Sequence, residues 1–278
     1  MRFGAHVSIA GGIENAPLRA AQLGCECFQM FTRSPRGGKP PQLEDQLLEA
    51  FFLNCSEASI SDYYVHTPYF INLASGKEEL RKKSLNLVRE ELHRSSLLGV
   101  KYMMTHIGSA KGMEREVALD KVVDSILRIL GNYGGTTRLL LENTAGQGDT
   151  IGASFDEISL ILRRAAHKNL GVCIDTAHMF ASGYDIRTLE GVENMVERIS
   201  AAFPPGTVKL VHANDSKAEF DSSKDRHEHI GRGKIGIECF RAMIGNPFFR
   251  NLDMIVEMPS PEVAGDVELL KELRDAYV

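Results

Sequence analysis

Short apolar runs alternate with longer amphipathic stretches along the whole chain. Each run is rich in Val, Ile, Leu, Met or aromatic residues and is bounded by polar residues, Gly or Pro, as buried parallel strands are. We expect eight strands, in the runs 3–9, 27–31, 63–67, 102–108, 138–144, 171–178, 208–215 and 254–260.

The stretches between these runs have helical periodicity. Residues 114–130 carry Val, Leu and Ile at near-helical spacing among charged residues. Ser154 is followed three residues later by Glu157, the S-x-x-E form of a capping box, which predicts a helix start. We expect helices at 16–23, 43–60, 76–98, 114–130, 154–164, 189–203, 236–244 and 263–276.

This alternation predicts the fold. Eight strand–helix units in 278 residues match the (β/α)8 barrel, which is typically about 250 residues long. A doubly wound open sheet would need a glycine fingerprint after an early strand, and Gly4, Gly11 and Gly12 do not supply one. No compositional break divides the chain. We therefore predict the α/β class, with a single TIM-barrel domain over residues 1–278.

Composition narrows the class of protein. A hydrophobic content of 43% and a charged content of 25% are ordinary for a globular protein. No apolar run approaches a membrane span, and the N-terminus lacks the apolar core of a secretory signal, so we expect a cytoplasmic protein. The net charge of −5 is no global signature of a nucleic-acid binder. Affinity for DNA would have to come from local basic patches.

The cysteines do not form a recognisable metal or disulfide pattern. Their number is odd and no C-x-x-C pair occurs, so we expect all five to be reduced and mostly buried. They are Cys25, Cys27, Cys55, Cys173 and Cys239.

Metal-competent side chains instead collect at the ends of the predicted strands. In a TIM barrel the carboxyl ends of the strands form the active site. Each residue alone has a structural explanation, but nine on one rim predict a metal centre. Seven end or follow the predicted strands, and two lie on the loop after the seventh, within KDRHEHIGRGKIG (224–236). The nine are His66, His106, Glu142, Asp175, His178, His212, Asp225, His227 and Glu257.

Nine nitrogen and oxygen ligands are too many for one ion. With one bridging carboxylate they make about ten bonds, enough for three metals, since a catalytic zinc uses three protein ligands. Imidazole and carboxylate without thiolate suit Zn²⁺, with Mn²⁺ or Fe²⁺ as possible substitutes. Such centres are typical of phosphoester hydrolysis by a metal-activated hydroxide. His6 is expected beside this set, and the role of His229 stays open.

Long motifs resemble the endonuclease IV family, which cleaves DNA at apurinic/apyrimidinic sites. They are ENTAGQG (142–148), DTAHMFASGYD (175–185) and HANDSK (212–217) with the 224–236 stretch. GAHVS, FTRSPR, HTPYFINLAS and HIGS also look like the family, so the resemblance spans the chain.

The resemblance implies a trinuclear zinc barrel that hydrolyses the phosphodiester 5′ to an abasic site, leaving a 3′-hydroxyl and a 5′-deoxyribose phosphate. It also implies trimming of blocked 3′ ends. His66 and His106 would hold one zinc with Glu142, which would bridge to a second. Asp175, His212 and Glu257 would complete the second site, and the third would use His178, Asp225 and His227. Glu142 and Glu257 are the catalytic candidates. We expect a monomer acting on double-stranded DNA.

Two basic loops on the same rim are the predicted DNA contacts. One carries Arg33, Arg36 and Lys39, with Gly37 and Gly38 where the family often has an aromatic residue after the arginine. The other surrounds the metal-binding stretch with Lys224, Arg226, Arg232 and Lys234. An abasic nucleotide has lost its stacking, so it is extruded at lower cost. Arg36 and Tyr69 are the candidates to fill the gap.

Two other functions stay open. A sugar isomerase or epimerase of the same superfamily would use one or two ions and fewer ligands, leaving His178, Asp225 and His227 without a role. A metal count separates it from the nuclease. A non-catalytic metal- or DNA-binding protein would bind without turnover.

Overall fold

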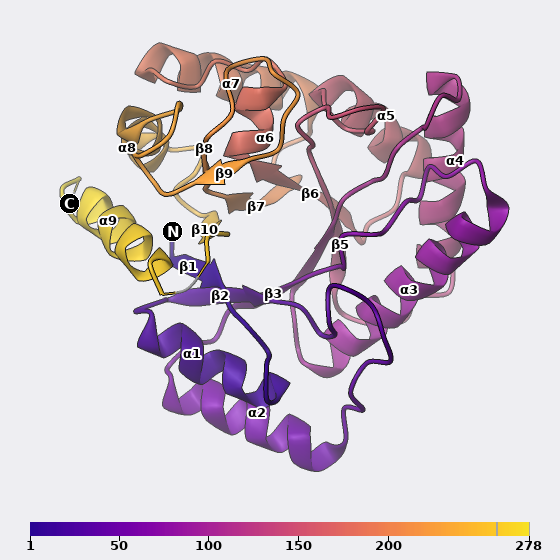
Figure 1. The fold of residues 1–278 in the computed structure, drawn as a ribbon, viewed down its shortest axis with the longest axis horizontal. Coiled ribbons are helices and arrows are strands. Elements are labelled where there is room, and N and C mark those ends of the chain that lie inside the picture. The colour runs from indigo at the N-terminus through magenta and orange to yellow at the C-terminus, as the bar shows by residue number, and fades with distance from the viewer. Residues whose placement is uncertain (260, 278) are drawn as a thin grey trace.

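Eight parallel strands close into a barrel in the computed structural model, which describes residues 1–259 and 261–277 (Figure 1). Neighbouring strands pair in the order β1-β10-β7-β6-β5-β4-β3-β2, and β1 closes the ring by pairing with β2 and β10. The predicted TIM barrel is confirmed; Ser260, in the eighth predicted run, and Val278 lie outside the described residues. The strands are β1 Phe3–His6, β2 Cys27–Met30, β3 Tyr63–His66, β4 Tyr102–Thr105, β5 Arg138–Glu142, β6 Leu170–Asp175, β7 Val208–His212 and β10 Asp253–Val256.

Helices surround the barrel, and each predicted helical stretch corresponds to one of them, with bounds that agree within three residues (Figure 1). The predicted cap of α5 is present, since Oγ of Ser154 accepts a hydrogen bond from the Glu157 N–H at 3.3 Å. A short 3-10 helix, Ile13–Asn15, precedes α1. The ring consists of α1 Ala16–Gln22, α2 Asp45–Glu57, α3 Glu78–Leu97, α4 Arg115–Leu130, α5 Phe155–Ala165, α7 Leu189–Ala202, α8 Ile237–Gly245 and α9 Val263–Asp275.

All eight barrel strands end between one and four residues before the predicted runs do, and in two of them a different element follows. The run 171–178 stops as a strand at Asp175, and a short helix α6, Thr176–Ala181, follows. Oδ1 of Asp175 accepts a hydrogen bond from the His178 N–H at 2.8 Å and so caps this helix. The run 208–215 leaves the barrel after His212. Its last residue begins β8, Asp215–Ser216, which pairs antiparallel with β9, His227–Glu228.

Alternate strand residues build two apolar layers. Inside the barrel lie Cys27, Tyr64, Met104, Leu140, Cys173, Leu210 and Ile255. Residues between them in sequence, such as Val65, Met103 and Leu141, face the helices in the larger core. The barrel interior is therefore filled by side chains, which leaves its carboxyl-terminal rim for polar groups.

The cysteines belong to this packing. All five are free and buried, as expected, and burial raises the pKa of Cys25 to about 11. Among the helices of residues 1–259 and 261–277, none has the length and apolar character needed to cross a bilayer.

Candidate metal centre

The structure brings all nine predicted metal ligands to one end of the barrel. Four are the last residues of their strands: His66 on β3, Glu142 on β5, Asp175 on β6 and His212 on β7. The remaining five are placed by short extensions of the same rim. His106 and Glu257 follow β4 and β10, His178 lies on α6, and Asp225 and His227 lie before and in β9.

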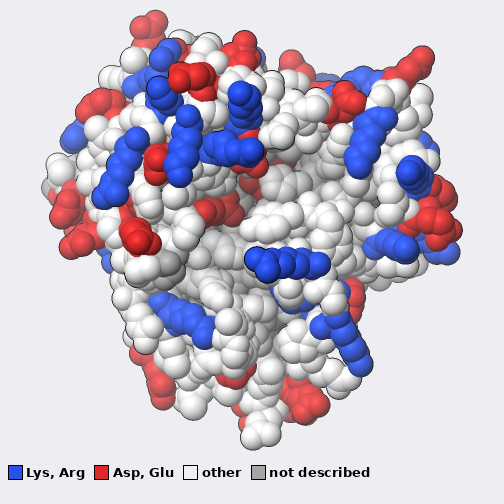
Figure 2. Space-filling model, viewed as in Figure 1, with Lys and Arg blue, Asp and Glu red and all other residues white. Residues whose placement is uncertain are grey.

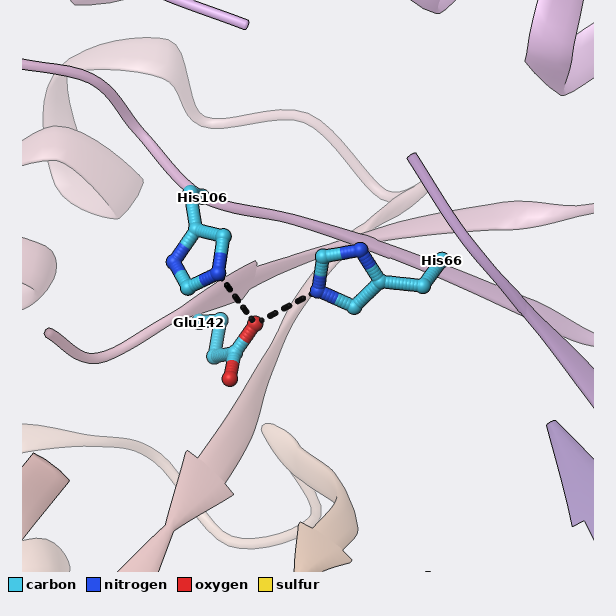
Figure 3. A group of neighbouring side chains, drawn as sticks. All are labelled: His66, His106 and Glu142. Atoms are coloured by element: carbon cyan, nitrogen blue, oxygen red, sulfur yellow. Dashed lines mark hydrogen bonds and ion pairs between the residues drawn. The ribbon is translucent and has the colours of Figure 1, made fainter. Parts of the chain in front are cut away.

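The first donor set consists of His66, His106 and Glu142 (Figure 3). Oε2 of Glu142 lies 2.9 Å from Nε2 of His66 and 3.8 Å from Nε2 of His106. Glu142 and His66 are buried, whereas His106 is partly open to solvent. Three donors from three neighbouring strands thus converge on one point.

The second donor set shares Glu142 with the first. It contains Glu142, Asp175, His212 and Glu257. Nδ1 of His212 lies 2.9 Å from Oε1 of Glu142 and 3.3 Å from Oε2 of Glu257. Glu142 therefore directs one carboxylate oxygen toward each set. This is the arrangement required of a bridging carboxylate.

The third donor set differs from the expected one in a single member. Asp175, His178 and His227 lie within ligand distance of one another. Asp225 stands beside them at the exposed edge, with Oδ2 at 3.1 Å from Nε2 of His178 and Oδ1 at 3.3 Å from Nε2 of His227. Asp175 thus faces both the second and the third set. The sequence-based assignment had placed it in the second set only.

One atom tests whether a cation fits this third set. Nε2 of His227 is buried and has no hydrogen-bond partner among the residues that the structure describes. It faces the carboxylates of Asp175, at 3.7 Å, and Asp225. A buried nitrogen without a partner is costly, and a metal ion between it and the carboxylates would satisfy all three groups.

Neighbouring oxygens select which nitrogen each histidine presents. Nδ1 of His66 lies 2.6 Å from the Thr67 carbonyl, and Nδ1 of His178 lies 3.0 Å from the Asn143 carbonyl. A carbonyl only accepts hydrogen bonds, so these ring nitrogens carry a proton, and the opposite Nε2 is the nitrogen available to bind a metal once it has no proton. Second partners of this kind fix the orientation of metal-binding histidines.

Two buried amides that the sequence analysis missed support the second set. Oε1 of Gln29 lies 2.8 Å from Nε2 of His212, and the amide Nε2 of Gln29 donates a hydrogen bond to Glu257 at 2.7 Å. Nδ2 of Asn214 donates to Asp175 at 2.7 Å. Gln29 could have been identified from the sequence by its polarity. It interrupts the apolar run CFQMF, and a buried amide needs hydrogen-bond partners.

The two remaining histidines near the rim are now placed. Nδ1 of His6 contacts Gln29 at 2.9 Å, and burial lowers the pKa of His6 to about 4, so the ring is neutral. His6 therefore lies beside the donor sets, as expected. His229 turns away from them, with Nδ1 at 2.7 Å from Oδ2 of Asp266 on α9.

A buried aspartate shapes the glycine-rich end of the 224–236 stretch. Asp215 accepts hydrogen bonds from the N–H groups of Gly233 and Ile235, each at 3.0 Å. A Cβ on Gly233 would lie 2.4 Å from Oδ1 of Asp215, so only glycine permits this approach. Because β8 pairs with β9, the contacts also support the position of His227.

The charges of the centre are strongly coupled. Burial opposes ionisation of Glu142, but His106 and His212 outweigh it and lower its pKa well below its usual value. Burial also opposes protonation of His178, whereas Asp175, Asp225 and Glu142 raise its pKa to about 10. Four carboxylates therefore lie close together and attract positive charge, either protons or metal ions.

A long depression passes over the three donor sets. A cavity of about 860 Å³ is lined by His66, His178 and Glu257 together with Phe31 and Lys39. A second cavity of about 570 Å³ continues past Asn72, Ser109 and Lys111. Tyr69, His106, His178 and Asp225 line both. The donor sets thus lie along a groove that suits an extended ligand.

Two of the predicted DNA contacts, Tyr69 and Lys39, line this groove, and most of the others are exposed. Tyr69 is 66% exposed and its ring packs edge-on against Phe31 at 5.3 Å. Basic side chains lie on opposite sides of the central hollow in Figure 2. The exposed cations of the two loops are Arg36, Lys39, Lys224, Arg226, Arg232 and Lys234.

Arg33 is the exception, and its assignment as a DNA contact is corrected. Its guanidinium is buried, with Nε at 2.5 Å from Oε1 of Glu91 and Nη2 at 2.7 Å from Oε2 of Glu90. Both partners lie on α3. The sequence could not reveal this, because the partners are separated from Arg33 by 58 residues in the case of Glu91.

Comparison with known proteins agrees with this geometry. The family model described as a xylose isomerase-like TIM barrel matches residues 17–276. The probable endonuclease 4 of Chlorobium phaeobacteroides is 40% identical, over 99% of both chains. That of Aquifex aeolicus is also 40% identical, over 99% of this chain and 97% of its own.

Some solved structures resemble the chain in both fold and sequence, whereas others share only the fold. Endonuclease IV from Thermus thermophilus superposes with a TM-score of 0.85 and 32% identity, covering 100% of this chain and 98% of its own. A D-tagatose 3-epimerase-like protein reaches a TM-score of 0.73 at 20% identity, over 100% of this chain and 98% of its own, a likeness of fold alone. The full-length relatives and the donor sets agree: the chain belongs to the endonuclease IV family of nucleases.

Proposed function

We propose that the chain hydrolyses the phosphodiester bond on the 5′ side of an abasic site in double-stranded DNA. The products are a 3′-hydroxyl and a 5′-deoxyribose phosphate, and the same site trims blocked 3′ ends. The observation that carries the proposal is the position of Glu142, whose two oxygens face two donor sets at the floor of the groove.

The donor atoms support three zinc ions, with Mn²⁺ or Fe²⁺ as substitutes. His66, His106 and Glu142 would hold the first, and Glu142, Asp175, His212 and Glu257 the second. His178, His227 and Asp225 would hold the third, with Asp175 facing it. Bound there, the ions would lower the pKa of the attacking water, neutralise the phosphate and stabilise the departing oxygen.

The residues of the chain supply position and charge. Glu142 and Glu257 would hold the metal ions at the floor of the groove. The surrounding histidines balance the negative charge of these two carboxylates. Tyr69 and Arg36 fill the gap left by the missing base, while Lys39, Arg226 and Arg232 face phosphates. These local cations explain how a chain with net charge −5 binds DNA. All donors come from one chain, so we propose a monomer.

Glu142→Gln tests the proposal, since it keeps the shape of the side chain and removes its charge. An amide is a poor bridge, and a loss of several kcal/mol of stabilisation means a rate lower by about 10³ or more. Abasic DNA should still bind within about tenfold, because phosphate contacts remain. The measurement is single-turnover cleavage with equilibrium binding of the same duplex, and exposed Glu190→Gln on α7 is the control. Cleavage within tenfold of wild type would contradict the role of Glu142.

A sugar isomerase or epimerase is the competing function, because such enzymes share the barrel. It would leave the third donor set without a role. Elemental analysis of the purified protein separates the two: a content near three metals per chain supports the nuclease, and one or two supports the isomerase. Incubation of an abasic duplex with the protein, with and without chelator, also distinguishes the two, because only the nuclease would cleave the duplex and only without chelator.

A further inference from the structure

The loop between β2 and α2 carries two of the exposed cations, Arg36 and Lys39, yet contains no helix or strand. We call residues 32–41 the recognition loop. In Figure 1 this loop extends from β2 past α3 before it reaches α2. Its two glycines, Gly37 and Gly38, have φ of 101° and 103°, a backbone conformation that glycine adopts without the steric cost of a side chain.

A single arginine on α3 ties the two ends of the recognition loop together. Nη2 of Arg94 donates to the Thr32 carbonyl at 2.8 Å, and Nη1 donates to the Pro41 carbonyl at 2.7 Å. Nε of the same side chain donates to Oγ1 of Thr32 at 2.9 Å. One planar guanidinium therefore fixes the separation and orientation of the two loop ends.

A buried carboxylate completes this connection. Glu91, fully buried one turn earlier on α3, accepts hydrogen bonds from Oγ1 of Thr32 and from Nε of Arg33, each at 2.5 Å. Arg33 thus anchors the loop from inside rather than contacting DNA. Thr32 relays between the two α3 residues, because its hydroxyl accepts from Arg94 and donates to Glu91.

The loop is also connected to the metal centre. Phe31, the residue before it, packs its ring against His6 at 4.4 Å, Tyr69 at 5.3 Å and His66 at 6.0 Å. Lys39 lines the cavity that contains His66 and Glu257. A shift of the loop ends would therefore move the groove wall relative to the donor sets.

Stability alone does not account for this buried ionic cluster. Buried ion pairs are often no more stabilising than apolar residues of similar volume, although breaking one is costly. Their directional hydrogen bonds do fix geometry, and a loop fixed before binding loses less entropy when it binds. The cluster joins α3 to a loop rather than to another core element, so the geometry it fixes is that of the loop.

We propose that Arg94 and Glu91 are positioning residues that hold the recognition loop in its DNA-binding conformation before DNA arrives. The proposal rests on the proposed function, because it takes abasic duplex DNA as the ligand of this loop. Neither residue contacts the donor sets. Their removal should therefore weaken selection of the abasic site without impairing the chemistry of bound DNA.

The test is Arg94→Met, which keeps the length of the side chain and removes its donors. The matched control is Arg81→Met on the same helix. Arg81 is 6% exposed, as Arg94 is 7%, but it binds Asp124 of α4 and Glu78 instead of the loop. The readouts are tryptic cleavage after Arg36, binding of abasic and intact duplexes, and single-turnover cleavage at saturating DNA.

We expect Arg94→Met to be cut after Arg36 faster than wild type and to bind abasic duplex about tenfold more weakly. Single-turnover cleavage of saturated enzyme should stay within about twofold, since only binding is affected. Arg81→Met should have lower thermal stability, but its tryptic cleavage after Arg36 and its binding of abasic duplex should match those of the wild type. A folded Arg94→Met with wild-type tryptic cleavage and wild-type abasic binding would overturn the proposal.

Thr32→Val gives the decision if Arg94→Met does not fold. It preserves shape but removes the hydroxyl that links Arg94 to Glu91, and it should show the same faster cleavage and weaker binding. Wild-type values in this variant would overturn the proposal. Failure of the proposed function looks different: the wild-type protein itself would neither prefer nor cleave abasic duplex, whereas tryptic cleavage would still report on the loop.

Discussion

The side-chain oxygen of Gln29 lies 2.8 Å from Nε2 of His212. Since an amide oxygen only accepts hydrogen bonds, this ring nitrogen carries the proton and Nδ1 is left to face Glu142 and Glu257. The other end of the amide donates to Glu257 at 2.7 Å. One fully buried side chain thus orients two members of the second donor set.

Gln29→Leu should therefore weaken metal retention while the barrel stays folded. It removes both contacts at similar volume, and loss of such a supporting contact lowers metal affinity by roughly 10–100-fold. The measurement is the rate at which a chelator strips metal from the purified protein, with exposed Gln22→Leu as control. Equal resistance of Gln29→Leu and wild type would show that Gln29 only fills space.

His227→Ala should empty or loosen the third site and leave the other two occupied. The variant removes the buried Nε2 that faces Asp175 and Asp225, whereas the first and second sets contain no atom of His227. We expect about one metal ion fewer per chain by elemental analysis and slower cleavage of abasic DNA. His93→Ala, on the exposed side of α3, is the control. Unchanged metal content and rate would remove the 224–236 stretch from the site.

Metal loading at pH 7 should release protons. Burial lowers the pKa of His178 but Asp175, Asp225 and Glu142 raise it to about 10 in the metal-free protein, so the ring is protonated at pH 7. A metal ligand must be deprotonated, and metal affinity should therefore rise with pH until that pKa is reached. Titration calorimetry in buffers of different ionisation enthalpy measures the released protons. Binding heats that do not depend on the buffer would contradict a protonated His178.

Arg36 and Arg226 should affect DNA binding in different ways. Arg36→Ala should reduce the preference for abasic over intact duplex, because Arg36 is proposed to fill the gap. Arg226→Ala should weaken both duplexes alike and reduce the slope of log affinity against log salt by about 0.9, the value for one phosphate contact. Salt titrations of both duplexes measure the two effects. An unchanged abasic preference in Arg36→Ala would exclude it from recognition.

Local patterning determined the barrel from the sequence alone. The apolar runs and amphipathic stretches predicted every barrel strand and every helix of the outer ring, because burial on both faces of a strand and on one face of a helix leaves distinct periodicities. Parallel strands in a closed barrel end on one rim, so the sequence alone predicts that His66, Glu142 and His212 lie close together.

Contacts between distant residues were decided only by the tertiary structure. The sequence does not distinguish Arg33 from Arg36, since both are basic residues of the same loop. In the structure Arg33 is buried and donates a hydrogen bond to Glu91 of α3, whereas Arg36 is exposed. Gln29 meets His212 and Glu257 across separations of 183 and 228 residues. Charge and polarity show that a side chain needs a partner. Which partner it finds depends on how helices and loops pack around the barrel, and no local periodicity records that packing.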